Sequence, residues 1–317
     1  MLARFFKSGP GILLLTPLVL LAGAGGLVGY QIHQVTHPPR LHDTNHPGDF
    51  LMRADDIDFQ STDGVSLSGW LIHGEREAPV ILLCHDLGES KSVFLDSAVA
   101  LQRMGYNLFL IDFRGHGESG GTASTLGNQE RYDVMGAVDF LRMRRDLSSD
   151  RMGIWGVGMG AYAAVLAAQE RKGLVALALD SLYPDINAYL DQALFKGVPR
   201  GASRVTSYAS TFYGPYFQWK IPRGEIAQAV TRLADRNLLF VAGDSKPWSV
   251  EAGKALYAAV PEGGGSDKNL LLLGSSGVAG LYAEDKRKYE EAITGFFGTY
   301  LHVHPEQAPE NIQVKIP

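Results

Sequence analysis

The sequence predicts an α/β fold with a mostly parallel central sheet and helices on both faces of that sheet. Two observations support this prediction. Short apolar runs at residues 79–85 and 107–113 are typical of strands that are buried on both faces. Segments with helical periodicity alternate with such runs along the body of the chain, as strand–helix–strand units require. Ligands in such sheets bind at the carboxyl ends of the strands.

The predicted elements begin with a β-hairpin. Residues 56–60 and 65–73 form its strands, and Asp63-Gly64 forms its turn. The further strands are expected at residues 79–85, 107–113, 152–157, 174–179, 238–242 and 270–273, and the helices at residues 91–104, 129–145, 160–169, 249–259 and 285–301.

Length and composition narrow the class of protein. A chain of 317 residues fits one large domain with additions, or two domains. Hydrophobic residues make up 45%, which excludes wholesale disorder. The net charge of −5 argues against a nucleic-acid-binding protein. The single cysteine, Cys84, excludes an internal disulfide and a cysteine-rich zinc site.

The N-terminal segment, residues 1–30, is predicted to be a membrane anchor. Arg4 and Lys7 precede an apolar run, and the next charged residue is Arg40. The run is long enough to span a bilayer as a helix. Basic residues before it predict a single pass with the N-terminus inside and the main domain extracytoplasmic.

A cleaved signal peptide is the alternative for this segment. Residues 12–21 have the length of a signal-peptide apolar region, and Ala22-Gly23-Ala24 resembles a cleavage site. The mature protein would then be secreted or periplasmic. A buried core helix is disfavoured because the run is not amphipathic.

The remaining chain divides into a linker, a domain and a tail. Residues 31–50 contain four histidines and three prolines and are interpreted as an exposed linker, with a metal-binding histidine tract as the alternative. Residues 51–302 form the domain, and residues 303–317 form a C-terminal tail. The aromatic-rich segment 182–232 is interpreted as an inserted cap; a longer crossover is the alternative. An apolar cap would favour a lipid or acyl ligand.

Five motif segments fall at the ends of predicted strands or before the last helix. They are His85-Asp86-Leu87-Gly88, the run from Asp112 to Ser119 (DFRGHGES), Gly156-Val157-Gly158-Met159-Gly160, Val241-Ala242-Gly243-Asp244, and the run from Gly274 to Tyr282. In this order they resemble the α/β-hydrolase superfamily, in its branch of lysophospholipases and serine aminopeptidases. The resemblance covers roughly residues 56–302 and implies that fold, with a serine–histidine–aspartate triad.

The triad positions that the resemblance implies hold other residues. The nucleophile elbow of the family is Gly-x-Ser-x-Gly, and here its central residue is Gly158. The position of the family's acid is Lys246, although a shifted register could use Asp244. The position of the histidine is Val278, and none of the nine histidines lies between residues 117 and 301. We therefore expect that the Ser-His-Asp chemistry is lost.

Other nucleophiles are weak candidates. Ser181 lies just past a strand end beside Asp180, which is typical of a structural strand-end residue. Ser245 and Lys246 suggest a serine–lysine pair, but their adjacency in sequence disfavours it. Ser275 and Ser276 have no visible base, and Cys84 and His85 point to opposite faces of a strand.

Two backbone amides in the elbow region remain available for binding. The resemblance assigns the oxyanion hole to the amides of Leu87 and Met159, and the latter lies at a helix N-terminus, which favours anions. An acyl, ester or other small anionic or carbonyl ligand would dock there. The sequence contains no recognisable cofactor or metal motif. The glycines of Gly156-x-Gly158-x-Gly160 do not have the spacing of a dinucleotide-binding loop.

The sequence thus leaves two main functional hypotheses. The favoured one is a membrane-anchored α/β-hydrolase-fold protein without triad chemistry, which binds a small molecule or a protein partner of unknown identity. The alternative is an active hydrolase of ester, amide or acyl substrates that uses atypical residues. A purely structural role in an envelope complex is a third possibility. The oligomeric state is not predicted.

Overall fold

The computed structural model describes residues 23, 25–27, 29–186, 189–190, 226–246, 249–262 and 266–303. The chain groups into two compact units, one of Met1–His37 with Ile186–Arg223 and one of Pro38–Asp185 with Gly224–Pro317. In the first unit, residues 29–36 are helical. The second unit contains the sheet and the site discussed below.

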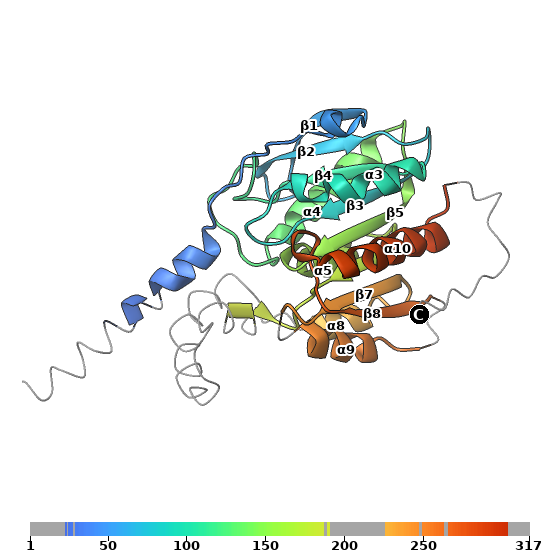
Figure 1. Cartoon of the computed structure of the whole chain (residues 1–317). Helices are drawn as coiled ribbons and strands as arrows, with labels where there is room; N and C mark the ends of the chain where they lie inside the picture. The colour runs from blue at the N-terminus through green and yellow to red at the C-terminus, as the bar shows by residue number, and fades with distance from the viewer. Residues whose placement is uncertain are drawn as a thin grey trace, which may run out of the picture. The chain divides into compact units, whose positions relative to one another are not determined.

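An eight-stranded sheet forms the centre of the second unit (Figure 1). Its strand order is β1-β2-β4-β3-β5-β6-β7-β8; β1 and β2 pair antiparallel, as do β2 and β4, and every other pair is parallel. The strands are β1 (Ala54–Gln60), β2 (Ser66–Ile72), β3 (Pro79–Cys84), β4 (Asn107–Ile111), β5 (Ser148–Val157), β6 (Leu174–Asp180), β7 (Asn237–Gly243) and β8 (Lys268–Leu273).

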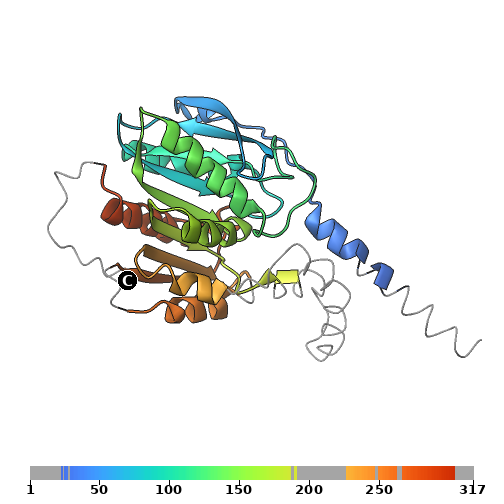
Figure 2. The same ribbon diagram turned by 180° about the vertical axis from the view of Figure 1, so that it is seen from behind.

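Helices cover both faces of this sheet. One face carries α3 and α10, and the other carries α4, α5, α8 and α9, as Figures 1 and 2 show from opposite sides. The helices are η1 (Pro47–Phe50), η2 (Lys91–Phe94), α3 (Leu95–Arg103), α4 (Glu130–Met143), α5 (Met159–Glu170), α8 (Ile226–Thr231), α9 (Ser249–Ala259), η4 (Val278–Gly280) and α10 (Ala283–Tyr300).

The predicted α/β fold with a mostly parallel sheet is confirmed, and the structure differs in two local features. Strand β5 begins at Ser148, because its polar first residues continue the strand beyond the apolar run. Helix α8 falls inside the segment expected to be a cap, yet it packs on α5 and α9 of the sheet unit. Most of the expected cap, residues 187–188 and 191–225, lies outside the described residues.

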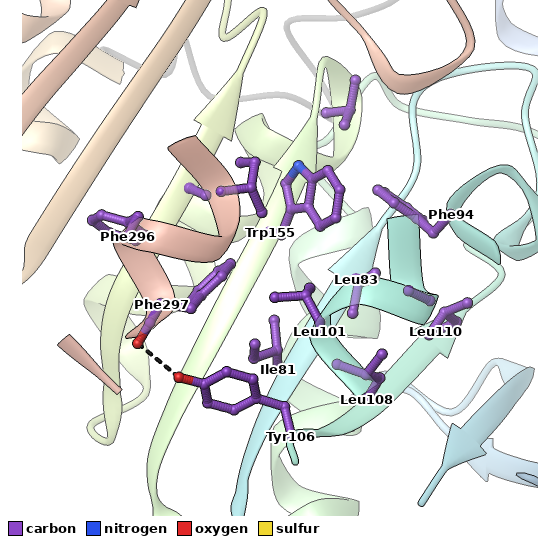
Figure 3. Close-up of a cluster of buried hydrophobic side chains, with 14 of the residues drawn as sticks. Ile81, Leu83, Phe94, Leu101, Tyr106, Leu108, Leu110, Trp155, Phe296 and Phe297 are labelled. Carbon is purple, nitrogen blue, oxygen red and sulfur yellow. Dashed lines mark hydrogen bonds between the residues drawn. The ribbon is translucent and has the colours of Figure 1, made fainter. Parts of the chain in front are cut away.

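The core between the sheet and the α3/α10 layer is built from large apolar side chains (Figure 3). The apolar runs predicted as strands form the sheet side of this core, and Ile81 and Leu83 of β3 are fully buried in it. Tyr106 adds a polar anchor, because its hydroxyl donates a hydrogen bond to the carbonyl oxygen of Phe297 at 2.9 Å. The other labelled members are Phe94, Leu101, Leu108, Leu110, Trp155 and Phe296.

A fully buried lysine joins the linker to the sheet. Lys91 Nζ lies 2.8 Å from Asp43, 2.6 Å from Asp112 and 3.0 Å from Glu118, and 4.5 Å from the centre of the Trp70 ring. A buried ammonium needs such partners, because burial of an unpaired charge is costly. Asp43 belongs to the segment expected to form an exposed linker. Residues 38–50 thus group with the domain instead of standing apart from it.

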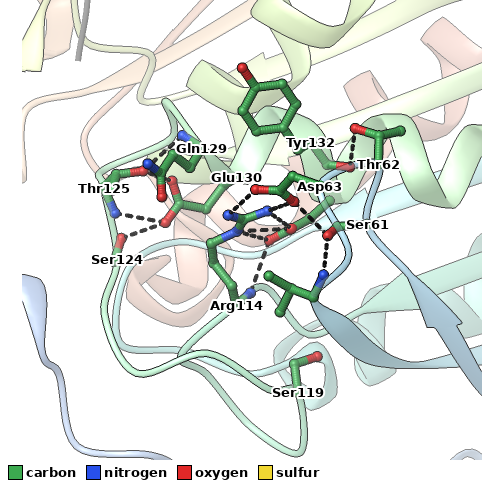
Figure 4. Close-up of polar contacts among 12 residues, drawn as sticks. Ser61, Thr62, Asp63, Arg114, Ser119, Ser124, Thr125, Gln129, Glu130 and Tyr132 are labelled. Carbon is green, nitrogen blue, oxygen red and sulfur yellow. Dashed lines mark hydrogen bonds and ion pairs between the residues drawn. The ribbon is translucent and has the colours of Figure 1, made fainter. Parts of the chain in front are cut away.

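The Asp112–Ser119 motif holds loops together through its side chains (Figure 4). Arg114 donates hydrogen bonds to the carboxylates of Asp133 and Asp63. Ser119 donates to the main-chain oxygen of Asp112 at 2.6 Å and accepts from the amide of Ser68. Every polar side chain mentioned here is committed to a neighbouring loop or strand, which is a structural role.

The expected N-terminal anchor and C-terminal tail lie largely outside the residues that the structure describes. Of residues 1–30 the structure describes only 23, 25–27 and 29–30, and of residues 303–317 only 303. Among the described residues, no helix combines the length and apolar character that a membrane span requires.

Candidate functional site

The candidate site lies at the carboxyl ends of the parallel strands. The residues that follow β3, β5, β6, β7 and β8 meet there, as the fold class leads one to expect. They contribute Asp86 after β3, Gly158 after β5, Ser181 after β6 and Lys246 after β7, while the loop after β8 runs toward η4.

Gly158 forms the sharp turn from β5 into α5. Its φ of 51° and ψ of −109° lie where residues with a Cβ are strained. A Cβ placed on Gly158 would lie 2.0 Å from Oδ1 of Asp86. The direction in which a side chain at this turn would project is therefore filled by the Asp86 carboxylate.

The amides of Leu87 and Met159 both donate to this carboxylate. The amide nitrogens of Leu87 and Met159 each lie 2.8 Å from Oδ1 of Asp86. Two amides that converge on one oxygen, one of them at the first turn of a helix, form the arrangement that stabilises an oxyanion in acyl transfer. In this structure the chain's own carboxylate occupies that arrangement. An external anion or carbonyl would have to displace it first.

Lys246 binds the second oxygen of the same carboxylate. Its Nζ lies 2.8 Å from Asp86 Oδ2. Burial alone would lower the pKa of Lys246, but the Asp86 charge raises it overall. Burial likewise opposes ionisation of Asp86, and Lys246 together with the two amides brings its pKa below the ordinary value. The pair is thus an ammonium and a carboxylate. We call the two amides and the Lys246 ammonium the cradle.

Two further carboxyl groups surround the cradle. Glu89 Oε2 accepts a hydrogen bond from the amide of Asp86 at 3.2 Å. Burial, followed by the Asp86 charge, raises the pKa of Glu89 to about 7. Asp180, at the end of β6, accepts from the Gly277 amide and from the Tyr289 hydroxyl, each at 2.8 Å, and burial raises its pKa.

The other predicted site residues have these positions. Val278 is the first residue of η4, is partly buried and packs against the core. Ser181 is 1% exposed, has a φ of 53°, and its Oγ lies 2.9 Å from Asp180 Oδ1 and from Ser276 Oγ. The Ser245 hydroxyl accepts from the Ser276 amide at 3.2 Å. Within the part of the chain that the structure describes, neither Ser181 nor Ser245 forms a hydrogen bond with a histidine or lysine side chain.

The two buried histidines near the site hold its loops. His85 Nε2 accepts from the Phe113 amide at 3.1 Å, and His116 Nε2 accepts from the Gly88 amide at 3.1 Å. Their other ring nitrogens face main-chain oxygens of Asp86 and Arg114. Accepting at Nε2 requires the neutral ring, and burial lowers the pKa of His85 to about 4. These histidines fix the loop that presents Asp86.

Sequence reasoning missed Asp86, Glu89 and Asp180 as members of the site. Asp86 belongs to the motif His85-Asp86-Leu87-Gly88, but the spacing of this motif does not indicate that the Asp86 carboxylate turns toward Gly158. The one available signal was the pairing of a lysine at the expected acid position with a carboxylate beside the expected oxyanion amides.

Among the residues that the structure describes, one group of carboxylates is close enough together to hold a metal ion: Asp43, Asp112 and Glu118. Lys91 Nζ lies within 3.0 Å of all three and provides the positive charge in that place.

Comparisons with known proteins agree with this fold and add sequence relatives. The profile described as "Serine aminopeptidase, S33" matches residues 75–244. The chain is 27% identical over 148 residues to the uncharacterised protein YfhR of Escherichia coli O157:H7, across 44% of this chain and 51% of YfhR. It is 30% identical over 176 residues to the α/β-hydrolase domain-containing protein WAV2 of Arabidopsis thaliana, across 53% of this chain and 56% of WAV2.

These matches span about half the length of each of the two relatives. Among solved structures, the Pyrococcus furiosus esterase Pf2001 superposes with a TM-score of 0.66 at 20% identity, covering 84% of this chain and 99% of the esterase. At that identity the likeness shows the fold.

A first prediction concerns the steric coupling of Gly158 and Asp86. Gly158→Ala should lower the free energy of unfolding by about 2–4 kcal/mol, because the backbone is strained and the methyl group meets the Asp86 carboxylate. In an Asp86→Gly background the loss should shrink by at least about 1 kcal/mol. Urea unfolding of the four proteins measures this cycle.

Gly280→Ala is the matched control, because nothing lies within 4 Å of its added Cβ. That change should stay within about 0.5 kcal/mol. Strictly additive effects of the Gly158 and Asp86 changes would show that the two positions do not touch.

A second prediction concerns the pH dependence of stability. Because the pKa of Glu89 is raised to about 7 in the folded protein, its protonated form favours folding. The stability of the wild type relative to Glu89→Gln should therefore be greatest below about pH 4.5, the ordinary pKa of the group, and should fall by on the order of 3 kcal/mol as the pH rises to about 8. Chemical unfolding at several pH values measures the difference; a difference that does not change with pH contradicts the assignment. The exposed Glu170, changed to Gln, is the control and should show no such trend.

Proposed function

The chain belongs to the serine aminopeptidase S33 family of the α/β-hydrolases, and we propose that it is a member that has lost Ser-His-Asp hydrolysis and acts by binding. The family gives the fold in which the site lies, and the proposal rests on the residues and hydrogen bonds of the site itself. Fold and family by themselves do not determine an activity.

The single observation that carries the proposal is the occupied cradle. Acyl transfer needs free amide donors where negative charge develops on the substrate oxygen. Here both donors are bound to Asp86 Oδ1, and Lys246 holds the other oxygen. A substrate carbonyl therefore has no free donor pair in this arrangement.

The nucleophile and the base are absent from their positions as well. Gly158 has no side chain, and the space that a serine would use contains Asp86. A serine hydroxyl needs a positioned base to attack, and Val278 is the residue at the expected histidine position. Both histidines nearest the site, His85 and His116, already accept backbone hydrogen bonds. Three separate requirements of the reaction are unmet.

The alternative of hydrolysis through atypical residues has less support. Ser181 is nearly inaccessible to solvent, and its hydroxyl is engaged by Asp180 and Ser276. Ser245 is exposed, but the amine of the adjacent Lys246 is committed to Asp86.

We also propose that residues 1–30 hold the domain at a membrane, with the domain on the extracytoplasmic side. Support comes from the sequence alone, through the apolar run and the basic residues that precede it. The binding partner would then be a small molecule or protein at that membrane.

Hydrolysis assays test the loss of catalysis. The wild type should cleave p-nitrophenyl acetate and butyrate with a kcat/KM below about 10 M⁻¹s⁻¹, some three orders of magnitude under the usual range of enzymes. A fluorophosphonate probe should leave it unlabelled. The variant Gly158→Ser should also stay unlabelled, because Asp86 and the missing base remain.

A combined variant serves as the positive control. Asp86→Gly, Gly158→Ser, Lys246→Asp and Val278→His together supply a nucleophile, a base, an acid and free amides, and labelling is expected there. Wild-type hydrolysis that is abolished by Ser181→Ala or by Ser245→Ala would instead establish the alternative function.

Membrane extraction tests the anchor. The full-length chain should remain in the membrane pellet after an alkaline carbonate wash and dissolve in detergent, whereas a variant without residues 1–30 should stay in the supernatant. External protease should reach the domain in spheroplasts. Intact-mass measurement of a shortened mature chain in the soluble fraction would support the cleaved signal peptide and contradict the anchor.

A further inference from the structure

We propose that the cradle of the Leu87 and Met159 amides and the Lys246 ammonium is a binding site for a monocarboxylate, in which the side chain of Asp86 is an exchangeable internal occupant. The proposal rests on the non-catalytic function proposed above and names the class of ligand for the same site.

The donors of the cradle match both oxygens of a carboxylate. The two amides reach one oxygen of Asp86 at 2.8 Å each, and Lys246 reaches the other at 2.8 Å. Charge-assisted hydrogen bonds of this length are among the strongest in proteins. The Asp86 side chain therefore displays the functional group that the cradle recognises, already bound in the required orientation.

Asp86 can leave the cradle without a change of the backbone. Its amide is held by Glu89 and its carbonyl oxygen by His85, so the main chain stays fixed. The carboxylate stands on a single methylene group, and rotation about χ1 removes it from the donors. The side chain of Asp86 is 13% exposed and that of Lys246 is 27% exposed, so the cradle borders solvent.

An empty cradle would be unfavourable. When Asp86 turns away, two amides and one ammonium lose their acceptor in a mostly buried place. Some other acceptor must replace it, and a ligand with a carboxylate restores all three bonds. Exchange of the internal carboxylate for an external one conserves the hydrogen bonds that the cradle donates, while the displaced Asp86 carboxylate exchanges its bonds for water at the solvent border of the cradle.

The charges around the cradle favour a single negative charge on the ligand. When a ligand replaces Asp86, the carboxyl groups of Glu89, Asp180 and the displaced Asp86 all lie near the one ammonium of Lys246. A phosphate with two negative charges would meet more repulsion than a monocarboxylate. The ligand class is thus the monocarboxylate, whether a free acid or the C-terminus of a peptide.

Removal of the internal occupant tests this site. Asp86→Gly should bind acetate and butyrate, measured by calorimetry and by thermal shift, and should bind acetamide and inorganic phosphate far more weakly. Adding Lys246→Met should weaken acetate binding at least about tenfold, because the charged donor is lost. Adding Lys254→Met, a change of an exposed lysine on α9, is the matched control and should leave acetate binding unchanged.

The wild type should bind the same acids with lower affinity. An occupant that leaves the cradle for about 1–10% of the time weakens apparent binding by about 10–100-fold relative to Asp86→Gly. N-acetyl-glycine compared with its amide separates recognition of a peptide C-terminus from that of a simple acid. If Asp86→Gly does not fold, Asp86→Asn replaces it; its neutral amide should give way to acetate at least about tenfold more readily than the wild-type carboxylate.

Failure to bind acetate in both Asp86 variants would overturn the inference, as would binding that Lys246→Met leaves unchanged. Wild-type protein that never binds acetate would show that Asp86 is not exchangeable, which also overturns it. These outcomes leave the proposed loss of catalysis intact, because ester hydrolysis is assayed separately on the same preparations. Ester hydrolysis by the wild type would contradict the proposed function, whether or not acetate binds.

Discussion

The site depends on the bonds between the Asp86 carboxylate, two backbone amides and the Lys246 ammonium. These bonds connect the loop after β3, the first turn of α5 and the loop after β7. They also explain the glycine at the elbow, because a side chain at position 158 and the Asp86 carboxylate need the same space. In a mostly buried place the ammonium and the carboxylate stabilise each other's charged forms, and removal of either would leave the other unpaired. One carboxylate thus occupies the space of a side chain at position 158 and binds both amides and the Lys246 ammonium.

The motif that most strongly indicated the family has a structural role in this protein. Asp112 accepts from Lys91, Arg114 binds Asp133, and His116 accepts from the Gly88 amide. His116, together with His85 directly after β3, holds the loop that presents Asp86 in place. These bonds are needed by the fold whether or not a reaction takes place. A match to a hydrolase profile over residues 75–244 therefore reflects these structural contacts and does not by itself determine an activity.

Much of the fold could be predicted from the sequence, because its signals are local. The buried strands β3 and β4 appear as continuous apolar runs, and the turn of β1 and β2 appears as Asp63-Gly64. Helix α8 was missed because six residues within an aromatic-rich segment give no clear period. Most of residues 38–50 are exposed, as the sequence predicts, but their polar composition does not reveal that the side chain of Asp43 is buried against Lys91.

The glycine at position 158 and the lack of any histidine after residue 117 and before residue 302 are visible in the sequence, so these features of the site could be predicted. The occupant of the cradle could not. Asp86 and Lys246 are 160 residues apart, and their contact depends on the strand order and on the orientation of two side chains. No local pattern encodes either property.

A crystal structure of the unliganded protein, at a resolution that defines side-chain oxygens, tests the central claim most directly. The account predicts electron density for the Asp86 carboxylate between the amides of Leu87 and Met159, with one oxygen within hydrogen-bond distance of both and the other facing Lys246. Density that places Asp86 in solvent, with water on the two amides and Lys246 turned elsewhere, would contradict it.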